Sequence, residues 1–282
     1  RKNDRFAIRH SISYMARNQP IGIFDSGIGG LTVANAVSGL LPEEEIIYFG
    51  DTAHLPYGDK SAESIQHYSL RITDFLLEKN CKLILIACNT ASAAAFETVE
   101  KYLNGNVPLV NVIDPVVEAV AADLSIRKIG IIGTKGTIKS GVYEQKLKAL
   151  RPDLETVALA TALLASMIEA GFYNNSVSQA VINSYLAYPD FSDIQGMIMA
   201  CTHYPLIEKE VASYFNQRIK IFNSNNLVAN RVKKTLEQLD LLNDARQNPH
   251  HFYVSDFTES FEQTTKIFFQ GEIHLEHSPI WE

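Results

Sequence analysis

Cysteine is scarce in this sequence, where only Cys81, Cys88 and Cys201 occur among 282 residues. A small, odd number of cysteines provides no disulfide framework and is typical of a reducing compartment, so we expect a cytoplasmic protein. No two of the cysteines form a CxxC pair, which leaves a zinc site or a thioredoxin-type redox pair without support. The question is then what these thiols do.

Long apolar runs and clusters of basic residues are also absent. No run approaches the roughly 20 apolar residues that span a bilayer, so we expect no membrane partner. The net charge is −7 and the basic residues are scattered, which argues against a nucleic-acid partner. The first 20 residues are polar and lack the apolar region of a secretory signal. We therefore set residues 1–19 apart as an N-terminal extension.

What the sequence does contain is an alternation of short apolar runs and helical patterns. With 46% hydrophobic residues, there is ample material for a core. Strands are predicted at 21–25, 46–50, 83–87, 109–113, 128–134, 155–159, 196–200, 219–223 and 252–255. Helices are predicted at 29–40, 61–79, 89–103, 138–150, 161–170, 176–188, from about 205, and at 225–242 and 257–269. This order predicts an α/β fold with mainly parallel sheets covered on both faces.

Two stretches of the sequence are echoed later in the chain. "IGIFDSG" from residue 21 resembles "IGIIGTKG" from residue 129, and "LILIACNTA" around Cys88 resembles "GMIMACTHY" around Cys201. The alternative explanation is chance similarity between buried strands, but the shared Ala-Cys and the Thr that follows argue against it. The echo predicts two similar α/β halves, each with a cysteine at the end of a strand.

The two strand-end thiols indicate acid/base chemistry. Ligands of open parallel sheets bind outside the carboxyl ends of the strands, where Cys88 and Cys201 fall. Each thiol precedes a predicted helix start, and such positions lower the pKa of a cysteine and attract carboxylates. A thiolate on one side of a carbon and a thiol on the other invert its stereochemistry without a cofactor. Packing is the alternative role for a buried cysteine, and we assign it to Cys81.

Polar residues near these strand ends are suited to an amino-acid ligand. Asp25 and Ser26 open the glycine-rich stretch "DSGIGG", which is neither G-x-G-x-x-G nor a Walker sequence, so it is weak support for a nucleotide. "HLPYGD" at 54–59 follows the second strand as a loop. His203, two residues after Cys201, is a candidate to polarise the thiol or orient the ligand.

No cofactor or metal is expected. Asp51 and His54 lack further ligands for a metal site. Lys60, Lys135 and Lys139 show no sign of the desolvation that a Schiff base with pyridoxal phosphate requires.

Five stretches together carry a family likeness. "IGIFDSGIGGLTV", "FGDTAHLPYG", "IACNTASA", "IGIIGTKGTIKSGVYE" and "ACTHYPL" closely resemble the motifs of glutamate racemases, which are cofactor-independent enzymes of the aspartate/glutamate racemase superfamily. The resemblance implies two pseudosymmetric three-layer α/β domains with the active site in the cleft between them. The first domain would comprise residues 20–113 plus 224–282, and the second residues 114–223.

The resemblance also implies the reaction and the residues that perform it. The family interconverts L- and D-glutamate and supplies D-glutamate for peptidoglycan. Cys88 and Cys201 would be the acid/base thiols, Asp25 would assist Cys88, and Glu169 and His203 would support Cys201. The implied substrate-binding residues are Asp25, Ser26, Tyr57, Gly58, Asn89, Thr90, Thr202 and His203.

Partners and alternatives follow from the same likeness. Family members are often dimers, so we expect a homodimer, and some members need a cell-wall precursor as activator. The alternatives are a racemase for aspartate or a hydantoin, a non-catalytic amino-acid-binding protein, and a thiol hydrolase or redox pair.

Overall fold

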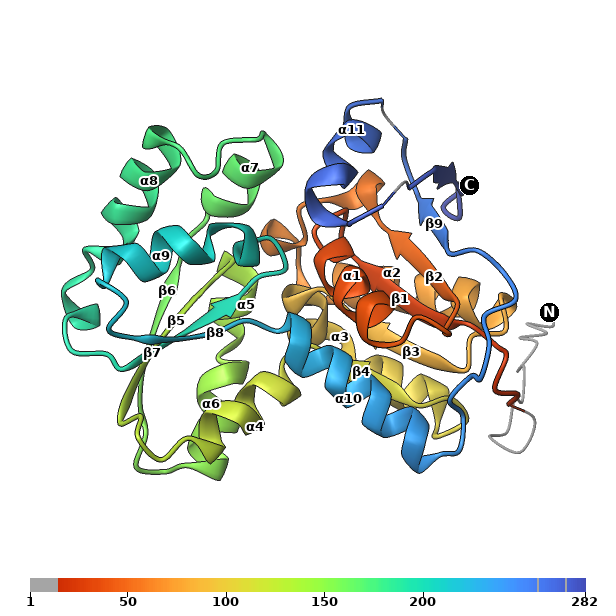
Figure 1. Ribbon diagram of the computed structural model, residues 1–282, viewed down its shortest axis with the longest axis horizontal. Coiled ribbons are helices and arrows are strands. Elements are labelled where there is room, and N and C mark those ends of the chain that lie inside the picture. Colours follow the sequence, from red (N-terminus) through yellow and green to blue (C-terminus); the bar gives the residue numbers. More distant parts are fainter. Residues whose placement is uncertain (1–14, 258, 272) are drawn as a thin grey trace.

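The computed structural model describes residues 15–257, 259–271 and 273–282, so most of the predicted extension at 1–19 lies outside the described residues. It has two lobes, each built on one sheet (Figure 1). In the first lobe the described residues form six strands in the order β10-β9-β2-β1-β3-β4. Their bounds are β1 (Ile21–Asp25), β2 (Ile46–Gly50), β3 (Leu83–Ile86), β4 (Leu109–Asn111), β9 (His251–Val254) and β10 (Leu275–His277).

The second lobe contains a sheet of four described strands in the order β6-β5-β7-β8. These are β5 (Lys128–Gly133), β6 (Glu155–Ala160), β7 (Gly196–Ala200) and β8 (Lys220–Phe222). Every strand pairing in both sheets is parallel. The predicted α/β class with mainly parallel sheets is confirmed. The domain boundaries proposed from the sequence stay a prediction.

Helices pack around the sheets of both lobes, and those of the first lobe cover both faces of its sheet (Figure 1). The helices are α1 (Leu31–Leu40), α2 (Ala62–Glu78), α3 (Asn89–Leu103), α4 (Asp114–Ala122), α5 (Lys135–Ser140), α6 (Val142–Leu150), α7 (Leu164–Glu169), α8 (Ser176–Leu186), α9 (Glu208–Tyr214), α10 (Asn225–Gln238) and α11 (Glu259–Phe268). Helix α1 packs against α10, and α2 packs against α3. Helix α4 contacts both α6 and α10 and so joins the two lobes (Figure 1).

Alternation along the strands explains this layering. Ile21 and Ile23 belong to the apolar cluster that includes α1 and α10. Phe24, Ile84 and Ile86 belong to the cluster that includes α2 and α3. Successive side chains of a strand point to opposite faces, so a run that is apolar throughout requires a cover on both sides.

Three elements differ from the sequence prediction. Helix α4 was not predicted, although Pro115 lies in its first turn, where proline favours a helix start. The predicted helix at 138–150 is two helices, α5 and α6, separated at Gly141 with a φ of 64°. Strand β10 was not predicted either, and its residues are mostly exposed.

The strand ends of both sheets supply the residues of interest. Strand β1 ends at Asp25, and β3 ends two residues before Cys88. In the second lobe, β5 ends immediately before Thr134 and β7 immediately before Cys201. Because all strands are parallel, these ends lie at one edge of each sheet.

Candidate active site

One pocket brings the predicted site residues together from both lobes. Its volume is about 50 Å³, and its walls include every sequence-predicted site residue except Asp25. The predicted residues on its walls are Ser26, Tyr57, Gly58, Cys88, Asn89, Thr90, Glu169, Cys201, Thr202 and His203, and further wall residues are Gly27, Leu55, Pro56, Thr134, Ala165 and Ser166. Cys81 is not among them and packs in the core, as expected.

Cys88 lies between β3 and α3, as the N-cap of the helix. Its Sγ accepts a hydrogen bond from the backbone N–H of Ala91 at 3.4 Å and lies 3.7 Å from Ser26 Oγ. Burial nevertheless raises the pKa of Cys88 to about 12, and the charge of Asp25 adds to the rise. The expectation that the helix start lowers this pKa is wrong for the structure, because one N–H donor does not offset the desolvation of a buried thiolate.

Cys201 begins a short chain of polar contacts. His203 Nδ1 lies 3.6 Å from Cys201 Sγ, and His203 Nε2 lies 2.8 Å from Glu169 Oε1. Burial opposes a charged imidazole, but the hydrogen bonds with Cys201 and Glu169 outweigh it and raise the pKa of His203 well above its ordinary value. A protonated His203 donates to the carboxylate from one nitrogen and to the sulfur from the other.

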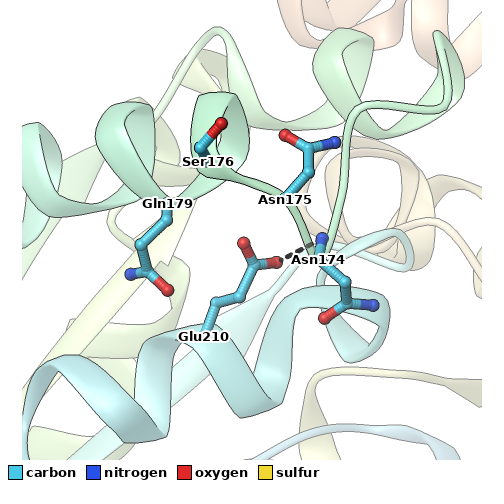
Figure 2. Close-up of a pocket in the computed structure, with 5 residues that line it drawn as sticks. All are labelled: Asn174, Asn175, Ser176, Gln179 and Glu210. Atoms are coloured by element: carbon cyan, nitrogen blue, oxygen red, sulfur yellow. Dashed lines mark hydrogen bonds between the residues drawn. The ribbon is translucent and has the colours of Figure 1, made fainter.

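Glu169 is the last residue of α7, and hydrogen bonds with a side chain of α9 fix the turn that follows it. Gly171 and Asn174 adopt positive φ angles in this turn. Glu210 of α9 accepts a hydrogen bond from the backbone N–H of Asn174 at 3.0 Å and another from the hydroxyl of Ser178. Figure 2 shows Glu210 pointing toward the backbone of Asn174. Both residues line an open hollow of about 390 Å³. This anchor joins the start of α8 to α9 and so helps to hold the end of α7 in place.

Asp25 lies just behind the pocket wall. Its Oδ2 accepts hydrogen bonds from the backbone N–H groups of Gly27 at 3.0 Å and Gly30 at 3.1 Å. Its buried Oδ1 has no hydrogen-bond partner among the described residues. Burial raises the pKa of Asp25, and the neighbouring His203 charge opposes that rise. One carboxylate oxygen is therefore left for a ligand or for Cys88.

The glycines of "DSGIGG" permit this close packing. A Cβ at Gly30 would come within 2.5 Å of Asp25 Cβ, and a Cβ at Gly29 within 2.2 Å of His203 Cε1. Since His203 follows β7 of the second lobe, Gly29 is where the two lobes meet beside the pocket. At Gly29 and Gly30 the absence of a Cβ therefore lets protein side chains approach the backbone closely.

Asn89 and Thr90 open α3 and face the second lobe. Asn89 Oδ1 accepts a hydrogen bond from the Tyr143 hydroxyl at 2.6 Å, while its buried Nδ2 has no partner among the described residues. Thr90 Oγ1 lies 2.8 Å from Thr134 Oγ1 and 3.1 Å from Thr137 Oγ1. Sequence reasoning missed Tyr143, Thr134 and Thr137, although all three lie in the quoted "GTKGTIKSGVYE" motif.

The loop after β2 supplies Tyr57 and Gly58, which belong to a short 3₁₀-helix (Tyr57–Asp59). The Tyr57 hydroxyl donates to Asp51 Oδ2 at 2.7 Å, so it is committed to the protein rather than to a ligand. The first N–H groups of a helix lack internal acceptors, and those of Tyr57 and Gly58 are the groups available to a carboxylate. Thr202 has its own carbonyl bound by the Thr32 hydroxyl at 2.9 Å.

The described residues contain neither a metal-binding cluster nor a membrane-spanning helix. Within residues 15–257, 259–271 and 273–282, no group of three or more His, Cys, Asp or Glu side chains could hold a metal ion. In that same part of the chain, no helix has the length and apolar character needed to cross a membrane.

Comparisons with known proteins agree with this architecture. The Asp/Glu/hydantoin racemase family model matches residues 32–232. A glutamate racemase of Geobacter metallireducens is 38% identical over 90% of this chain and 93% of its own length. The crystal structure of Francisella tularensis glutamate racemase in complex with D-glutamate is 36% identical, covers 94% of this chain and 99% of its own, and has a TM-score of 0.88. The Escherichia coli glutamate racemase, solved with L-glutamate and the activator UDP-MurNAc-Ala, shares the fold at 23% identity and a TM-score of 0.75, over 92% of this chain and 98% of its own.

A fold of two parallel α/β sheets with a thiol from each at one pocket, together with these matches, defines the class: the chain belongs to the Asp/Glu/hydantoin racemase family. Within that family its place is among the glutamate racemases, since curated relatives with that activity are 36–38% identical over 90% or more of the chain. The family resemblance read from the motifs is confirmed.

Proposed function

We propose that the protein interconverts L- and D-glutamate with Cys88 and Cys201 as its two acid/base groups. The observation that carries the proposal is that a strand-end thiol from each lobe lines one pocket. Family membership supports glutamate as the substrate, because the D-glutamate complex is of a relative 36% identical to this chain.

The chemistry needs only proton transfers. One cysteine, as thiolate, removes the α-proton, and the electron pair of the broken C–H bond stays on the substrate as a carbanion conjugated with its carboxyl group. The other cysteine, as thiol, delivers its proton to the opposite face and becomes the new thiolate. The reverse direction exchanges the two roles, so no electron acceptor or cofactor is consumed.

The remaining pocket residues are proposed to bind the substrate and tune the thiols. Asp25 Oδ1 is a buried acceptor suited to the substrate ammonium, and Asn89 Nδ2 is a buried donor suited to a carboxylate. Ser26, Thr90, Thr202 and the backbone of Tyr57 and Gly58 add donors around them. His203, held by Glu169, stabilises negative charge on Cys201.

The pocket must widen to admit its substrate. Its volume of about 50 Å³ is far below the roughly 300–1,000 Å³ of typical ligand pockets. Because the walls come from both lobes, we propose that a movement between the lobes admits glutamate and then encloses it.

The biological setting is also a proposal. D-glutamate made by this family is used for peptidoglycan, and the three unpaired cysteines are typical of a cytoplasmic protein. A homodimer is expected from the family resemblance, and sedimentation of the purified protein would test it. Activation by a cell-wall precursor is tested by adding UDP-MurNAc-Ala to the assay.

Circular dichroism of glutamate tests the main proposal. We expect purified enzyme without added cofactor to convert L-glutamate to the racemate and, in heavy water, to place deuterium on the α-carbon of the product. Aspartate and hydantoins assayed in parallel should turn over far more slowly. Tight glutamate binding without α-proton exchange would instead identify an amino-acid-binding protein.

A further inference from the structure

A buried carboxylate outside the pocket organises the loop that forms one of its walls. Asp51 directly follows β2 and is fully buried. Its Oδ2 accepts from the Tyr57 hydroxyl at 2.7 Å and lies 3.0 Å from His54 Nδ1. Its Oδ1 accepts from the Ser255 hydroxyl at 2.7 Å and from Trp281 Nε1 at 3.0 Å. We call Asp51 and these four side chains the Asp51 cluster.

Three members of the Asp51 cluster, Asp51, His54 and Tyr57, belong to the pocket loop itself. The loop runs from Asp51 through His54 to Tyr57 and Gly58, which line the pocket. The backbone N–H of Asp51 donates to the carbonyl of Asp25 at 3.0 Å. The position of the Asp51 carboxylate therefore decides where the Tyr57 and Gly58 backbone lies relative to Asp25.

The other two members come from the far end of the chain. Ser255 directly follows β9, and its Oγ also accepts from the backbone N–H of Ala53 at 3.0 Å. Trp281 is the only tryptophan and the penultimate residue of the sequence. Its ring packs edge-on against His54, with 4.6 Å between ring centroids and an angle of 88°.

The terminal segment that carries Trp281 is itself anchored. Ser278 donates its backbone N–H to the carbonyl of Val254 at 2.9 Å, which continues the pairing of β10 with β9. Arg71 Nε of α2 donates to the carbonyl of Ile280 at 3.1 Å. Trp281 is thus held at a fixed place, and an indole N–H to a buried carboxylate is among the stronger kinds of hydrogen bond.

We propose that Trp281 is a positioning residue for substrate binding, because its indole donates to Asp51 and packs on His54 and so fixes the loop that presents Tyr57 and Gly58 to glutamate. The inference rests on the proposed function, since it assigns substrate binding to this loop. Trp281 is not among the residues that line the pocket. Its loss should therefore weaken substrate binding more than proton transfer.

Steady-state kinetics of three variants test the proposal. Trp281→Phe keeps the ring against His54 but lacks the N–H, and Trp281→Ala lacks both. Losing a hydrogen bond to a charged group corresponds to about tenfold or more in an equilibrium constant. We expect the KM for glutamate to rise about tenfold in Trp281→Phe, which loses the hydrogen bond, and further in Trp281→Ala, with kcat changing less than KM in both.

Glu276→Gln is the matched control. Glu276 lies on β10 of the same terminal segment, and its exposed carboxylate lies 2.8 Å from His251 Nδ1 of β9. Its KM should stay within about twofold of wild type, because a surface pair contributes little.

KM separates positioning from a merely structural role, since it does not depend on how much of the enzyme is folded. A wild-type KM in both tryptophan variants would overturn the inference, even if kcat or the unfolding temperature fell. If Trp281→Ala is too unstable to assay, Trp281→Phe decides alone. A wild-type protein without racemase activity would instead refute the proposed function, and the inference with it.

Discussion

Replacing Gly29 with alanine tests whether the ring of His203 must stay where it lies. A Cβ at Gly29 would approach His203 Cε1 to 2.2 Å, whereas ordinary contacts begin at 3.4 Å. The ring is not free to swing away, because Nε2 is bound to Glu169 at 2.8 Å and its edge packs on Phe268 with 5.4 Å between ring centroids. It must therefore shift by roughly 1 Å, a displacement large enough to disturb catalytic alignment.

The size of the effect follows from that shift. His203 Nδ1 now lies 3.6 Å from Cys201 Sγ, and a further displacement removes this contact. A misplacement of about 1 Å costs on the order of 100-fold in rate, which corresponds to about 2.7 kcal/mol in the barrier. Since the two enantiomers of glutamate have equal free energy, kcat/KM must fall by the same factor in both directions.

The assay is the initial rate from L- and from D-glutamate, followed by circular dichroism. Gly39→Ala is the control, because a Cβ there meets nothing within 4 Å and alanine is favoured over glycine in a helix by about 0.5–1 kcal/mol. Gly39→Ala should keep full activity with equal or higher stability. If Gly29→Ala is folded and its kcat/KM lies within about threefold of the control, the role given to His203 is wrong.

Three further expectations concern the thiols and their neighbours. Cys88→Ala and Cys201→Ala should each abolish racemisation, whereas Cys81→Ala, which removes a core thiol, should keep ordinary kcat; turnover in either of the first two would contradict the two-thiol scheme. Because the pKa of His203 is raised in the folded state, its protonation stabilises that state. The contribution is complete below the pKa of the unfolded chain, about 6.5, and is lost as pH rises through the pKa of the folded state. The free energy of unfolding, measured with urea, should therefore fall between about pH 6.5 and about pH 8 for wild type but not for His203→Gln. Equal pH dependence of this free energy in the two proteins would refute the assignment. Tyr143→Phe removes the hydroxyl that donates to the Asn89 carboxamide and should lower kcat/KM about tenfold. An unchanged kcat/KM would show that this hydrogen bond is not needed.

Local patterns predicted the strand ends well, for a physical reason. Buried parallel strands are continuous apolar runs, so the places where "IGIFD" and "LILIA" stop were visible in the sequence, and Asp25 and Cys88 were placed with them. Helix α4 was missed, although Pro115 lies in its first turn, where proline favours a helix start. Strand β10 is three residues long and mostly exposed, so it carries no apolar signal.

Contacts between distant segments could not be predicted in the same way. The hydrogen bond from Trp281 to Asp51 joins residues 230 positions apart, and no periodicity encodes such a pairing. Thr134 was within a quoted motif, but its contact with Thr90 depends on how the two lobes meet. The pKa of Cys88 depends on total burial, which a helix-start argument from the sequence does not measure.

That pKa places a requirement on the reaction. Burial and the Asp25 charge both raise the pKa of Cys88, while the raised pKa of His203 favours a positively charged donor beside Cys201. Cys88 therefore holds its proton more firmly than a free cysteine does. In the proposed two-thiol scheme, turnover of one enantiomer needs Cys88 as a base, so substrate binding must reduce the cost of a thiolate there. The substrate ammonium is the group that can do so, because it brings a positive charge toward the unpartnered Oδ1 of Asp25 and offsets the negative charge that holds the proton on Cys88.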